Sequence, residues 1–337
     1  MRTLLLQFYR QSVLGKALLT IPRSFYKRSM NRFLSDEAWY RNMFAWTHGY
    51  ALDLDNPRTL NEKIQWLKLY DRDPDLTHWA DKHKVRDYIR EIIGPQYLIP
   101  LLAVAEDPHQ IDFDALPEPF IIKPTHLSGQ VAIVRDKREV NWPSVVKRCR
   151  LWLKTNLYRE GREWHYRDIP PQIIVERLLV DEEGAVPPDY KFHCFHGRIG
   201  AIQVDIDRQT HHRRNFYDID WSRLPFTWSV CVGDRPLWPQ GREMERPNVL
   251  PEMIEVTERL ARHFRYVRID WYVVADKIYF GEVTFHHGGG DECIVPFEWD
   301  RKLGEKLQLP ERPRERLRER HTCHYRELMS DVDQRWL

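Results

Sequence analysis

Two acidic residues lie in otherwise apolar segments toward the C-terminal end of the chain. Asp270 belongs to RIDWYVV (residues 268–274) and Glu282 to KIYFGEVTF (residues 277–285). Both segments are rich in β-branched and aromatic residues and flank the short turn Ala275-Asp276, which predicts a β-hairpin. Burying an unpaired carboxylate is costly, so two acids that converge on one hairpin indicate a bound cation. Mg²⁺ is the natural candidate, because it takes oxygen ligands and shares its coordination shell with phosphates.

A glycine-rich turn follows the predicted hairpin. Gly288–Gly290 lets the backbone approach a ligand closely, because glycine has no side chain. The pattern R-x-D, then G-E-x-(N/T), then a glycine-rich turn resembles the C-terminal lobe of the ATP-grasp ligases, the superfamily of D-alanine:D-alanine ligase and biotin carboxylase. The longer pattern D-W-Y, I-Y-F-G-E-V-T-F, G-G-G and P-F-E-W-D is similar to the TupA-like ATP-grasp branch, which is found among cell-surface polysaccharide genes. This resemblance extends, with gaps, over residues 35–304.

The resemblance implies an α+β architecture, the ATP-grasp fold, in which two α+β lobes with antiparallel sheets sandwich ATP. A helical N-terminal region is expected to precede the lobes. The expected division is a basic amphipathic helix over residues 1–34, a helical region similar to a preATP-grasp domain over 35–115, a small lobe with a phosphate loop over 116–180, a large lobe with the metal site over 181–304, and a charged helix over 305–337.

The metal ligands implied by the resemblance lie on the predicted hairpin. In the family, the acids matching Asp270 and Glu282 hold Mg²⁺ on the ATP phosphates, and an asparagine two residues after the glutamate completes the set. This chain has Thr284 there, whose hydroxyl is a weaker oxygen ligand. Arg268, on the strand face of Asp270, is expected to hold the carboxylate substrate and the developing phosphoryl charge. The alternative for Arg268 is a salt bridge within the lobe.

A lysine and a loop of small residues indicate phosphate binding in the preceding lobe. Lys123 lies toward the end of the apolar strand expected over 120–124, where a lysine is a poor core residue and a good phosphate ligand. The alternative is an edge residue whose amine reaches solvent. Ser128 and Gly129 follow in a loop that resembles the flexible ATP-grasp loop over the triphosphate, where backbone N–H groups can cradle oxygens.

A second cation and the adenine contacts are expected from two further segments. Residues 81–86 resemble the ATP-grasp helix pattern D-K-x-x-(V/T)-(K/R), which supplies a cation to the nucleotide. Lys84 is the expected cation, Lys82 is the alternative, and a solvated helix face is the interpretation without function. The resemblance also implies that Glu176 lies near the exocyclic amine of adenine, with the backbone around Leu179 beside the ring.

Additional charged residues are expected around the ribose and the γ-phosphate. Asp189 stands where the family has an acid on the ribose hydroxyls, and Lys191 shares its strand face and is expected to point toward the nucleotide. Arg208 and Arg214 belong to the segment 205–218, and the corresponding loop of related ligases supplies cations near the γ-phosphate and the acceptor. The alternative for both arginines is a basic surface turn.

Three other regions have a less specific prediction. Residues 141–168 are predicted to form a helix on which basic residues alternate with aromatic ones, typical of an anion-binding face or, more commonly, of a solvated face over a packed one. Residues 219–248 are rich in Trp and Pro, which suits a substrate wall. Residues 296–300 are expected to close the last strand onto the core.

The bulk composition excludes some classes of protein. The 337 residues include 52 Lys and Arg against 50 Asp and Glu, a net charge of +2, so no overall field attracts nucleic acid. The 5 cysteines are odd in number and form no C-x-x-C pair, which favours a reducing cytoplasm. No apolar run in the sequence is long enough to span a membrane.

Both ends of the chain carry distinct patterns. Residues 1–33 are predicted to form a basic amphipathic helix, which either packs on the rest of the protein or contacts the inner membrane surface or a partner such as a glycosyltransferase. The motif His321-Thr322-Cys323-His324 either binds a metal or lies on a plain surface helix.

The favoured prediction is an ATP- and Mg²⁺-dependent ligase. A carboxylate attacks the γ-phosphate, an acyl phosphate forms, and an amine or amino acid displaces phosphate to leave an amide, as the family pattern implies. The resemblance suggests an acidic sugar, such as a uronic acid of a cell-surface polysaccharide or its precursor, as the carboxylate. One alternative is a kinase that phosphorylates a sugar hydroxyl. Another is a non-catalytic nucleotide- or glycan-binding module, which Thr284 in place of asparagine would suit.

Overall fold

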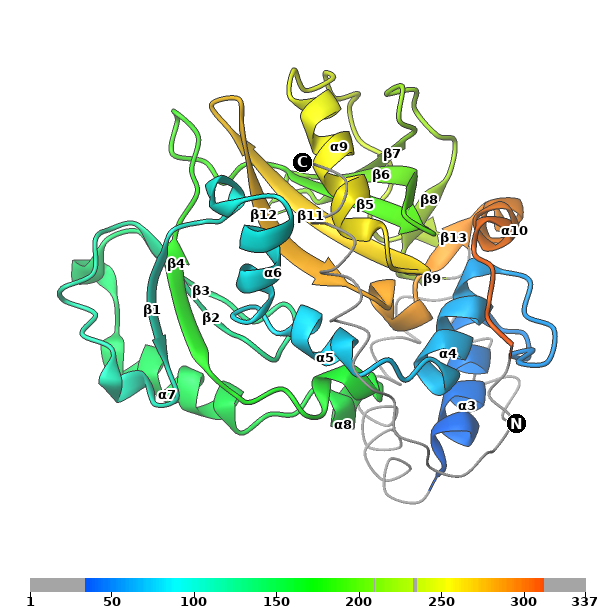
Figure 1. Ribbon diagram of the computed structural model, residues 1–337, viewed down its shortest axis with the longest axis horizontal. Coiled ribbons are helices and arrows are strands. Elements are labelled where there is room, and N and C mark those ends of the chain that lie inside the picture. The colour runs from blue at the N-terminus through cyan, green and yellow to red at the C-terminus, as the bar shows by residue number, and fades with distance from the viewer. Residues whose placement is uncertain (1–33, 209, 233–234, 312–337) are drawn as a thin grey trace, which may run out of the picture.

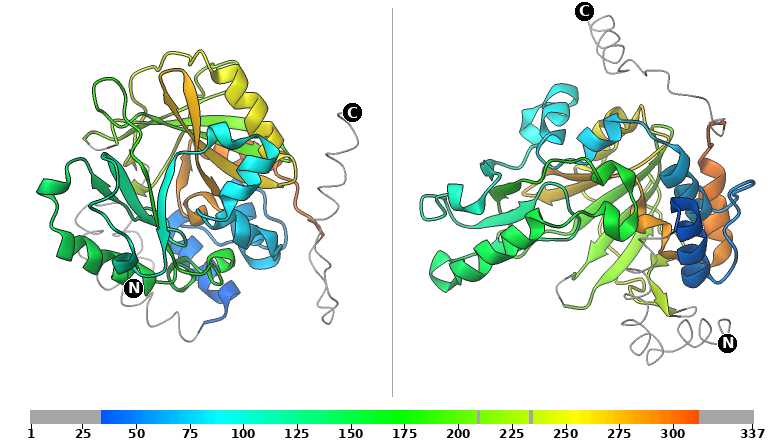
Figure 2. Two further views of the ribbon diagram at one scale, coloured as in Figure 1. Left: turned by 60° about the vertical axis from the view of Figure 1, so that its left-hand side comes forward. Right: turned by 90° about the horizontal axis from the view of Figure 1, so that it is seen from below.

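The computed structural model describes residues 34–311 apart from residue 209 and residues 233–234. The predicted helix over 1–33 and the motif over 321–324 lie outside the described residues, as does most of the charged C-terminal segment. Within the described part of the chain, none of the helices combines the length and the apolar character needed to cross a bilayer. The two larger sheets lie apart in Figure 1, the small one on the left and the large one in the upper centre, and Figure 2 shows them from two other directions.

The large sheet contains five antiparallel strands in the order β12-β11-β5-β6-β7. Their bounds, in that order, are Lys277–Thr284, Tyr266–Val274, Asp189–Phe195, Arg198–Ile206 and Arg213–Tyr217. The predicted hairpin is confirmed as β11 and β12. Val274 pairs with Lys277, and Ala275 and Asp276 both have positive φ, as the commonest two-residue hairpin turn requires.

One face of the large sheet is apolar and covered by helices. Side chains alternate between the two faces of a strand, so the cross-strand partners Phe192, Ile202 and Ile269 share a face and a core. The helices that contribute to this core are α5 (Asp75–Ala80), α6 (Val85–Ile92) and α9 (Leu250–Ala261). The opposite face of the same strands carries polar and charged residues over much of its area, which places them together at the site described below.

A second core covers one end of that opposite face. Phe195, Ala201 and Tyr266 pack there with three helices, α3 (Asp36–His48), α4 (Leu60–Tyr70) and α10 (Phe297–Lys306). A capping box between Thr59 and Glu62 fixes the start of α4. Residues 296–300, expected to close the last strand onto the core, begin α10 directly after the strand Cys293–Val295. Ile294 of that strand and Leu303 of α10 both pack in this second core.

The small sheet has the order β1-β4-β2-β3, with the strands Leu101–Ala105, Ile173–Arg177, Phe120–Pro124 and Ala132–Val134. Cys149 and Trp152 of α7 (Trp142–Leu153) pack on this sheet in a third core. The single helix predicted over 141–168 is broken. It divides into α7, a short α8 (Tyr158–Gly161) and the 3-10 turn η4 (Trp164–Tyr166). Arg162 takes a left-handed conformation that ends α8.

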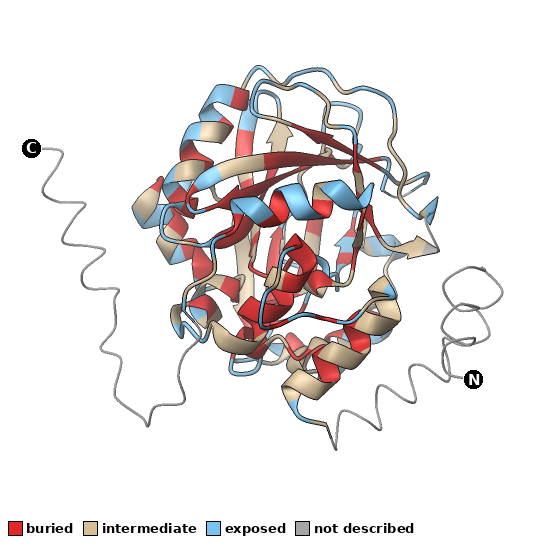
Figure 3. Cartoon of the chain, turned by 90° about the vertical axis from the view of Figure 1, so that its right-hand side faces the viewer, coloured by how far each residue is buried: buried red, intermediate tan, exposed pale blue. Residues whose placement is uncertain are grey.

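The remaining elements are short. Two-stranded pairs join β8 (Thr227–Ser229) to β13 (Cys293–Val295) and β9 (Cys231–Val232) to β10 (Arg235–Pro236). The other 3-10 turns are η1 (Pro95–Tyr97), η2 (Pro108–Gln110), η3 (Lys137–Glu139) and η5 (His287–Gly290). Figure 3 shows that the strands are mainly buried, whereas the helices around them alternate buried and exposed turns.

Candidate functional site

A row of polar residues crosses the large sheet on one face. Glu282 of β12 stands opposite Asp270 of β11, Asp270 opposite Lys191 of β5, and Lys191 opposite Gln203 of β6. Residues directly opposite each other in antiparallel strands share a face and have neighbouring side chains. The strand register therefore brings together the two predicted metal ligands and the predicted nucleotide lysine.

Arg268 joins the two acids of this row. Its Nε and Nη2 lie 2.6 and 2.7 Å from the two carboxylate oxygens of Asp270, and its Nη2 also lies 2.7 Å from Oε1 of Glu282. Arg268 and Asp270 are buried, whereas the side chain of Glu282 is 29% exposed. Arg268 thus forms the salt bridge within the lobe that was the alternative prediction for it. Glu282 is the more accessible of the two acids.

Lys191 connects Asp270 to a further acid. Its Nζ lies 2.6 Å from Oδ2 of Asp270 and 3.3 Å from Oδ2 of Asp189, and Arg208 contacts the same Asp189 oxygen. The other oxygen, Oδ1 of Asp189, is buried and has no hydrogen-bond partner among the residues that the structure describes. A buried acceptor without a donor is costly, so this oxygen is suited to a donor group on a ligand.

The small lobe contributes a second set of ion pairs. Lys123 Nζ lies 2.5 Å from Oε2 of Glu176, and Arg86 Nη1 lies 2.7 Å from Oε1 of the same residue. Glu176 therefore orients the predicted phosphate lysine. Sequence reasoning did not single out Arg86, although it occupies the last position of the D-K-x-x-(V/T)-(K/R) pattern.

Lys82, and not Lys84, lies at the site. Lys82 Nζ is 2.6 Å from the carbonyl oxygen of Leu127 and 3.9 Å from Oε2 of Glu282, so it links the loop of the small lobe to the large lobe. Lys84 is exposed and immediately precedes α6. The reason is local: residues 82–84 form a turn, and the backbone N–H of Lys82 donates to Thr125 of the small lobe.

The other predicted site residues lie in a loop, just after a strand and at the end of a strand. Ser128 and Gly129 are exposed in the loop between β2 and β3, and Gly129 has a positive φ with open space around it. Leu179 is half-buried just beyond β4. Thr284 stands opposite Arg268 in the β11–β12 register and is half-buried.

Arg214 belongs to a neighbouring network and not to a surface turn. It lies on β7, buried, with Nε 2.9 Å from Oδ1 of Asp205 and Nη1 2.8 Å from Oε2 of Glu292. His287 lies 3.2 Å from the same Glu292 oxygen, and its Nδ1 is 2.8 Å from Nη1 of Arg268. This network therefore supports Arg268 from the side away from the acids. Glu292 and His287 were not found from the sequence, because neither has a motif of its own.

The glycine turn η5 is held by polar side chains of the N-terminal helices. Lys68 Nζ and Gln65 Nε2 donate to the carbonyl oxygen of Gly289 at 2.8 and 2.9 Å. His48 Nε2 lies 2.9 Å from the carbonyl oxygen of Gly290. Gly290 has a φ of +70°, and a Cβ atom there would lie 3.3 Å from the backbone oxygen of Asn61, so glycine is favoured at this position.

The charges at the site favour an anionic ligand. We call the residues joined by these ion pairs the ion-pair cluster. It contains six cationic side chains and four carboxylates, which leave an excess of two positive charges: Lys82, Arg86, Lys123, Lys191, Arg208 and Arg268, with Glu176, Asp189, Asp270 and Glu282.

The electrostatics keep Glu282 ionised. Burial alone would raise the pKa of Glu282, but Lys82 and Arg268 lower it to about 2. Burial alone would lower the pKa of Arg268, but Asp270 and Glu282 raise it above its ordinary value. Burial lowers the pKa of Lys82, which Glu282 opposes.

The donor chemistry fits a nucleotide with a divalent ion. Asp270 and Glu282 offer carboxylate oxygens, the ligands that Mg²⁺ prefers, and the positive excess of the ion-pair cluster suits a polyphosphate. The unpaired Oδ1 of Asp189 suits a hydroxyl donor. Arg268 and Lys191 already contact these carboxylates, so a metal ion that binds there must compete with them.

Two α+β lobes with antiparallel sheets, joined by such a charged cluster, define the ATP-grasp class of proteins. Within this class, the family model described as "TupA-like ATPgrasp" matches residues 62–308, and the chain belongs to that family. A comparison with curated proteins found no match.

Solved structures of ATP-grasp ligases have low similarity to this chain. An L-amino acid ligase from Bacillus licheniformis is 14% identical over 77% of this chain and 57% of that chain, with a TM-score of 0.41. The D-alanine--D-alanine ligase from Bacillus anthracis complexed with ATP is 16% identical over 62% of this chain and 56% of that chain, with a TM-score of 0.39. The ATP-grasp ligase PsnB, complexed with a minimal precursor, Mg and ADP, is 12% identical over 74% of this chain and 65% of that chain, with a TM-score of 0.38. The chain thus spans less than two thirds of each of these proteins, and its family rests on the family model.

Proposed function

We propose that this protein is an ATP- and Mg²⁺-dependent ligase that forms an amide between a carboxylate and an amine or amino acid. The observation that supports it most is the row of Glu282, Asp270 and Lys191 with Arg268 between the two acids. This row combines oxygen ligands for a metal ion with cations for a phosphoryl group. Membership of the ATP-grasp family supports the same reaction class.

In this proposal the two lobes hold opposite ends of the triphosphate. Lys82 and Lys123 neutralise phosphate oxygens from the small-lobe side, and the backbone of Ser128 and Gly129 closes over them. Glu176 orients Lys123 through a 2.5 Å contact and borders the adenine pocket together with the backbone at Leu179. Asp189 accepts a hydrogen bond from the ribose through its free Oδ1.

The metal ligands are the two acids of the hairpin. Asp270 and Glu282 hold Mg²⁺, and Thr284 is the proposed third ligand in place of the asparagine of other members. Bound Mg²⁺ supplies neutralisation of phosphate charge. Because Glu282 is the more exposed acid and stays ionised to about pH 2, it is available to a metal ion over the whole physiological range.

The chemistry then needs positioned charge and no protein nucleophile. An oxygen of the substrate carboxylate attacks the γ-phosphorus, the bond to the β-γ bridging oxygen breaks, and ADP leaves. The amine attacks the acyl carbon of the acyl phosphate, loses a proton, and displaces phosphate. Arg268 and Lys191 stabilise the charge on the transferred group, and Arg208 and Arg214 are the proposed cations nearest the acceptor.

The proposed carboxylate is an acidic sugar, such as a uronic acid, of a cell-surface polysaccharide or its precursor. This part rests on the family alone. It implies a protein of the cytoplasm that works close to the inner face of the membrane, where residues 1–33 are the proposed contact. The proposed small lobe covers residues 116–180 and the proposed large lobe 181–304.

The test is an assay of ADP formation with ATP, Mg²⁺ and a panel of uronic acids and amines. We expect ADP only when a carboxylate is present, free phosphate in equal amount when an amine is added, and a product whose mass is that of the amide. Phosphate retained on the sugar would identify a kinase instead. Asp270→Asn and Glu282→Gln should abolish turnover. Asp276→Asn, in the exposed hairpin turn, is the matched control, because asparagine tolerates its positive φ.

A further inference from the structure

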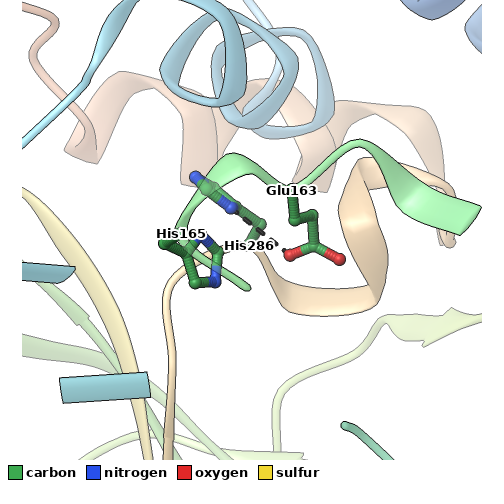
Figure 4. Close-up of side chains that lie close together, drawn as sticks. All are labelled: Glu163, His165 and His286. Carbon is green, nitrogen blue, oxygen red and sulfur yellow. Dashed lines mark ion pairs between the residues drawn. The ribbon is translucent and has the colours of Figure 1, made fainter. Parts of the chain in front are cut away.

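A second group of side chains with ligand chemistry lies beside η5. It consists of Glu163, His165 and His286, which we call the histidine cluster. Glu163 and His165 lie at η4, in the segment that follows α8, and His286 lies between β12 and η5. One nitrogen or oxygen atom of each residue lies within 4.8 Å of the others. Figure 4 shows the three side chains converging, with Nδ1 of His286 3.3 Å from Oε2 of Glu163.

The two imidazoles of this cluster are buried, and three of their four ring nitrogens have no hydrogen-bond partner within the described residues. His165 is fully buried, and neither of its ring nitrogens has a hydrogen-bond partner within the described residues. His286 is 3% exposed, and among the same residues its Nδ1 makes no hydrogen bond either, despite the short contact with Glu163. Nearly all buried polar atoms in folded proteins have a hydrogen-bond partner. Three buried nitrogens without such a partner, all in one place, therefore indicate a ligand.

The atoms of this cluster are of the types that ligate metal ions. Imidazole nitrogen is the commonest metal ligand in proteins. Glu163 supplies a carboxylate, so the cluster offers two nitrogen ligands and one oxygen ligand.

We propose that Glu163, His165 and His286 bind one Zn²⁺ ion, separately from the Mg²⁺ of the nucleotide site. Two histidines and one glutamate are an established ligand set for zinc, whereas Mg²⁺ prefers oxygen ligands only. Tetrahedral zinc holds ligand atoms roughly 3.4 Å apart, from bond lengths of about 2.0–2.2 Å. Side-chain rotations that bring the donor atoms up to about 1.4 Å closer together, with water as the fourth ligand, complete the site.

The ion links two segments that no β-ladder joins. Glu163 and His165 belong to the connection between α8 and β4, on the side of the small lobe, while His286 directly follows the strand that carries Glu282. The next residue, His287, contacts Arg268 at 2.8 Å. Zinc at His286 therefore fixes the backbone from which His287 supports Arg268, so the ion acts as a structural clamp and a positioning element for the nucleotide site.

The experiment uses the full chain with its other candidate metal motif removed. His321→Ala, Cys323→Ser and His324→Ala are introduced together, since these residues could bind zinc themselves. The protein is stripped with a chelator and titrated with Co²⁺, whose visible absorption reports tetrahedral coordination, and then with Zn²⁺. We expect one equivalent of Co²⁺, displaced by one equivalent of Zn²⁺, and an upward shift of the unfolding temperature with Zn²⁺ that an equal concentration of Mg²⁺ does not produce.

Substitutions assign the ion to the cluster. Glu163→Gln and His286→Gln should each weaken Zn²⁺ binding by on the order of 100-fold or more. Glu160→Gln, at an exposed position of α8 three residues before Glu163, and His78→Gln, an exposed histidine of α5, should leave it unchanged. Circular dichroism of each variant confirms that it folds. The proposal is overturned if the tail-substituted chain binds no stoichiometric Zn²⁺, or if the first two variants bind it as tightly as the controls do. The first outcome is measured on a chain whose histidine cluster is unchanged. It would therefore overturn the proposal even if one of the cluster variants fails to fold.

Discussion

The ion-pair cluster and the histidine cluster lie near the same end of β12 but satisfy their polar atoms in different ways. In the first, Arg268 and Lys191 contact the carboxylates at 2.6–2.7 Å, and cations exceed acids. In the second, a single carboxylate faces two neutral imidazoles, and three ring nitrogens have no hydrogen bond within the described residues. A cluster with its own counter-ions and a positive excess is suited to an anion such as a polyphosphate. A cluster of lone pairs without donors is suited to a cation.

The largest effect should come from removing the central acid of the ion-pair cluster. Asp270→Asn leaves Arg268 and Lys191 buried without their shared carboxylate, which costs about 3–5 kcal/mol of unfolding free energy. It also removes a proposed metal ligand, so ADP formation should fall on the order of 1,000-fold. Urea unfolding and the coupled ADP assay measure the two effects. Zinc binding at the histidine cluster should be unaffected, and a parallel loss of both ions would contradict the separation of the two sites.

The next effect distinguishes the two lysines of the segment 82–84. Lys82→Met should lower the rate of ADP formation by about 10–100-fold and raise the KM for ATP, because Lys82 lies 3.9 Å from Glu282 and contacts the phosphate loop. Lys84→Met, two residues away on an exposed side chain, is the matched control and should change neither value. Steady-state kinetics with varied ATP checks this pair. A loss confined to Lys84→Met would show that Lys84, the expected cation, is the lysine that acts, and would contradict the geometry.

The pH dependence of the unfolding free energy should distinguish an acid whose pKa is lowered by its contacts from an exposed acid. Burial alone would raise the pKa of Glu292, but His287 and Arg214 lower it from 4.5 to about 2. A carboxylate with a lowered pKa stabilises the fold above its unfolded pKa and loses that contribution as pH falls through the folded value. The difference in unfolding free energy between the native chain and Glu292→Gln should therefore hold from pH 7 to pH 5 and shrink by up to about 3 kcal/mol toward pH 2.

Urea unfolding at a series of pH values measures this difference. Glu298→Gln, an exposed acid of α10, is the control. A difference that already shrinks between pH 7 and pH 5 would mean that Arg214 and His287 do not lower the pKa of Glu292.

The smallest effect should follow from chelating zinc in the native chain. The unfolding temperature should fall by a few degrees, as expected for loss of one bound ion from a protein of this size. ADP formation with excess Mg²⁺ should fall only modestly, since the histidine cluster supports Arg268 indirectly through His287. Differential scanning calorimetry and the ADP assay on the same sample measure both. An abolished ADP signal that Zn²⁺ restores and Mg²⁺ does not would instead assign a catalytic role to the histidine cluster.

Local sequence periodicity was sufficient to predict the β11–β12 hairpin. Residues 268 and 270 are two apart on one strand, so they share a face in any register, and the turn residues Ala275 and Asp276 separate two β-rich arms. The pairing of Asp270 with Glu282 did not follow from this pattern. The turn alone would place Asp270 opposite Gly281, and an irregularity between Asp270 and Trp271 shifts the register by one residue. The family resemblance, which rested mainly on this hairpin and the turn after it, is confirmed by the family model that matches residues 62–308.

Contacts between distant segments could not be predicted in this way. Arg86 and Glu176 are 90 residues apart, and their ion pair depends on how α6 docks against the small sheet. The choice between Lys82 and Lys84 depended on whether residues 82–84 begin the helix or precede it, a boundary that periodicity does not fix. The histidine cluster combines an i, i+2 pair at η4 with one histidine beyond β12, a spacing that matches no metal motif.

The position of Arg268 has a consequence for the order of events during folding. Two carboxylates directly opposite each other on neighbouring strands repel, and this would oppose the register that pairs Asp270 with Glu282. The guanidinium contacts both, so attraction replaces repulsion in the chain itself. The hairpin can therefore reach its register while the polypeptide is still acquiring its tertiary structure, before any nucleotide or metal ion has bound.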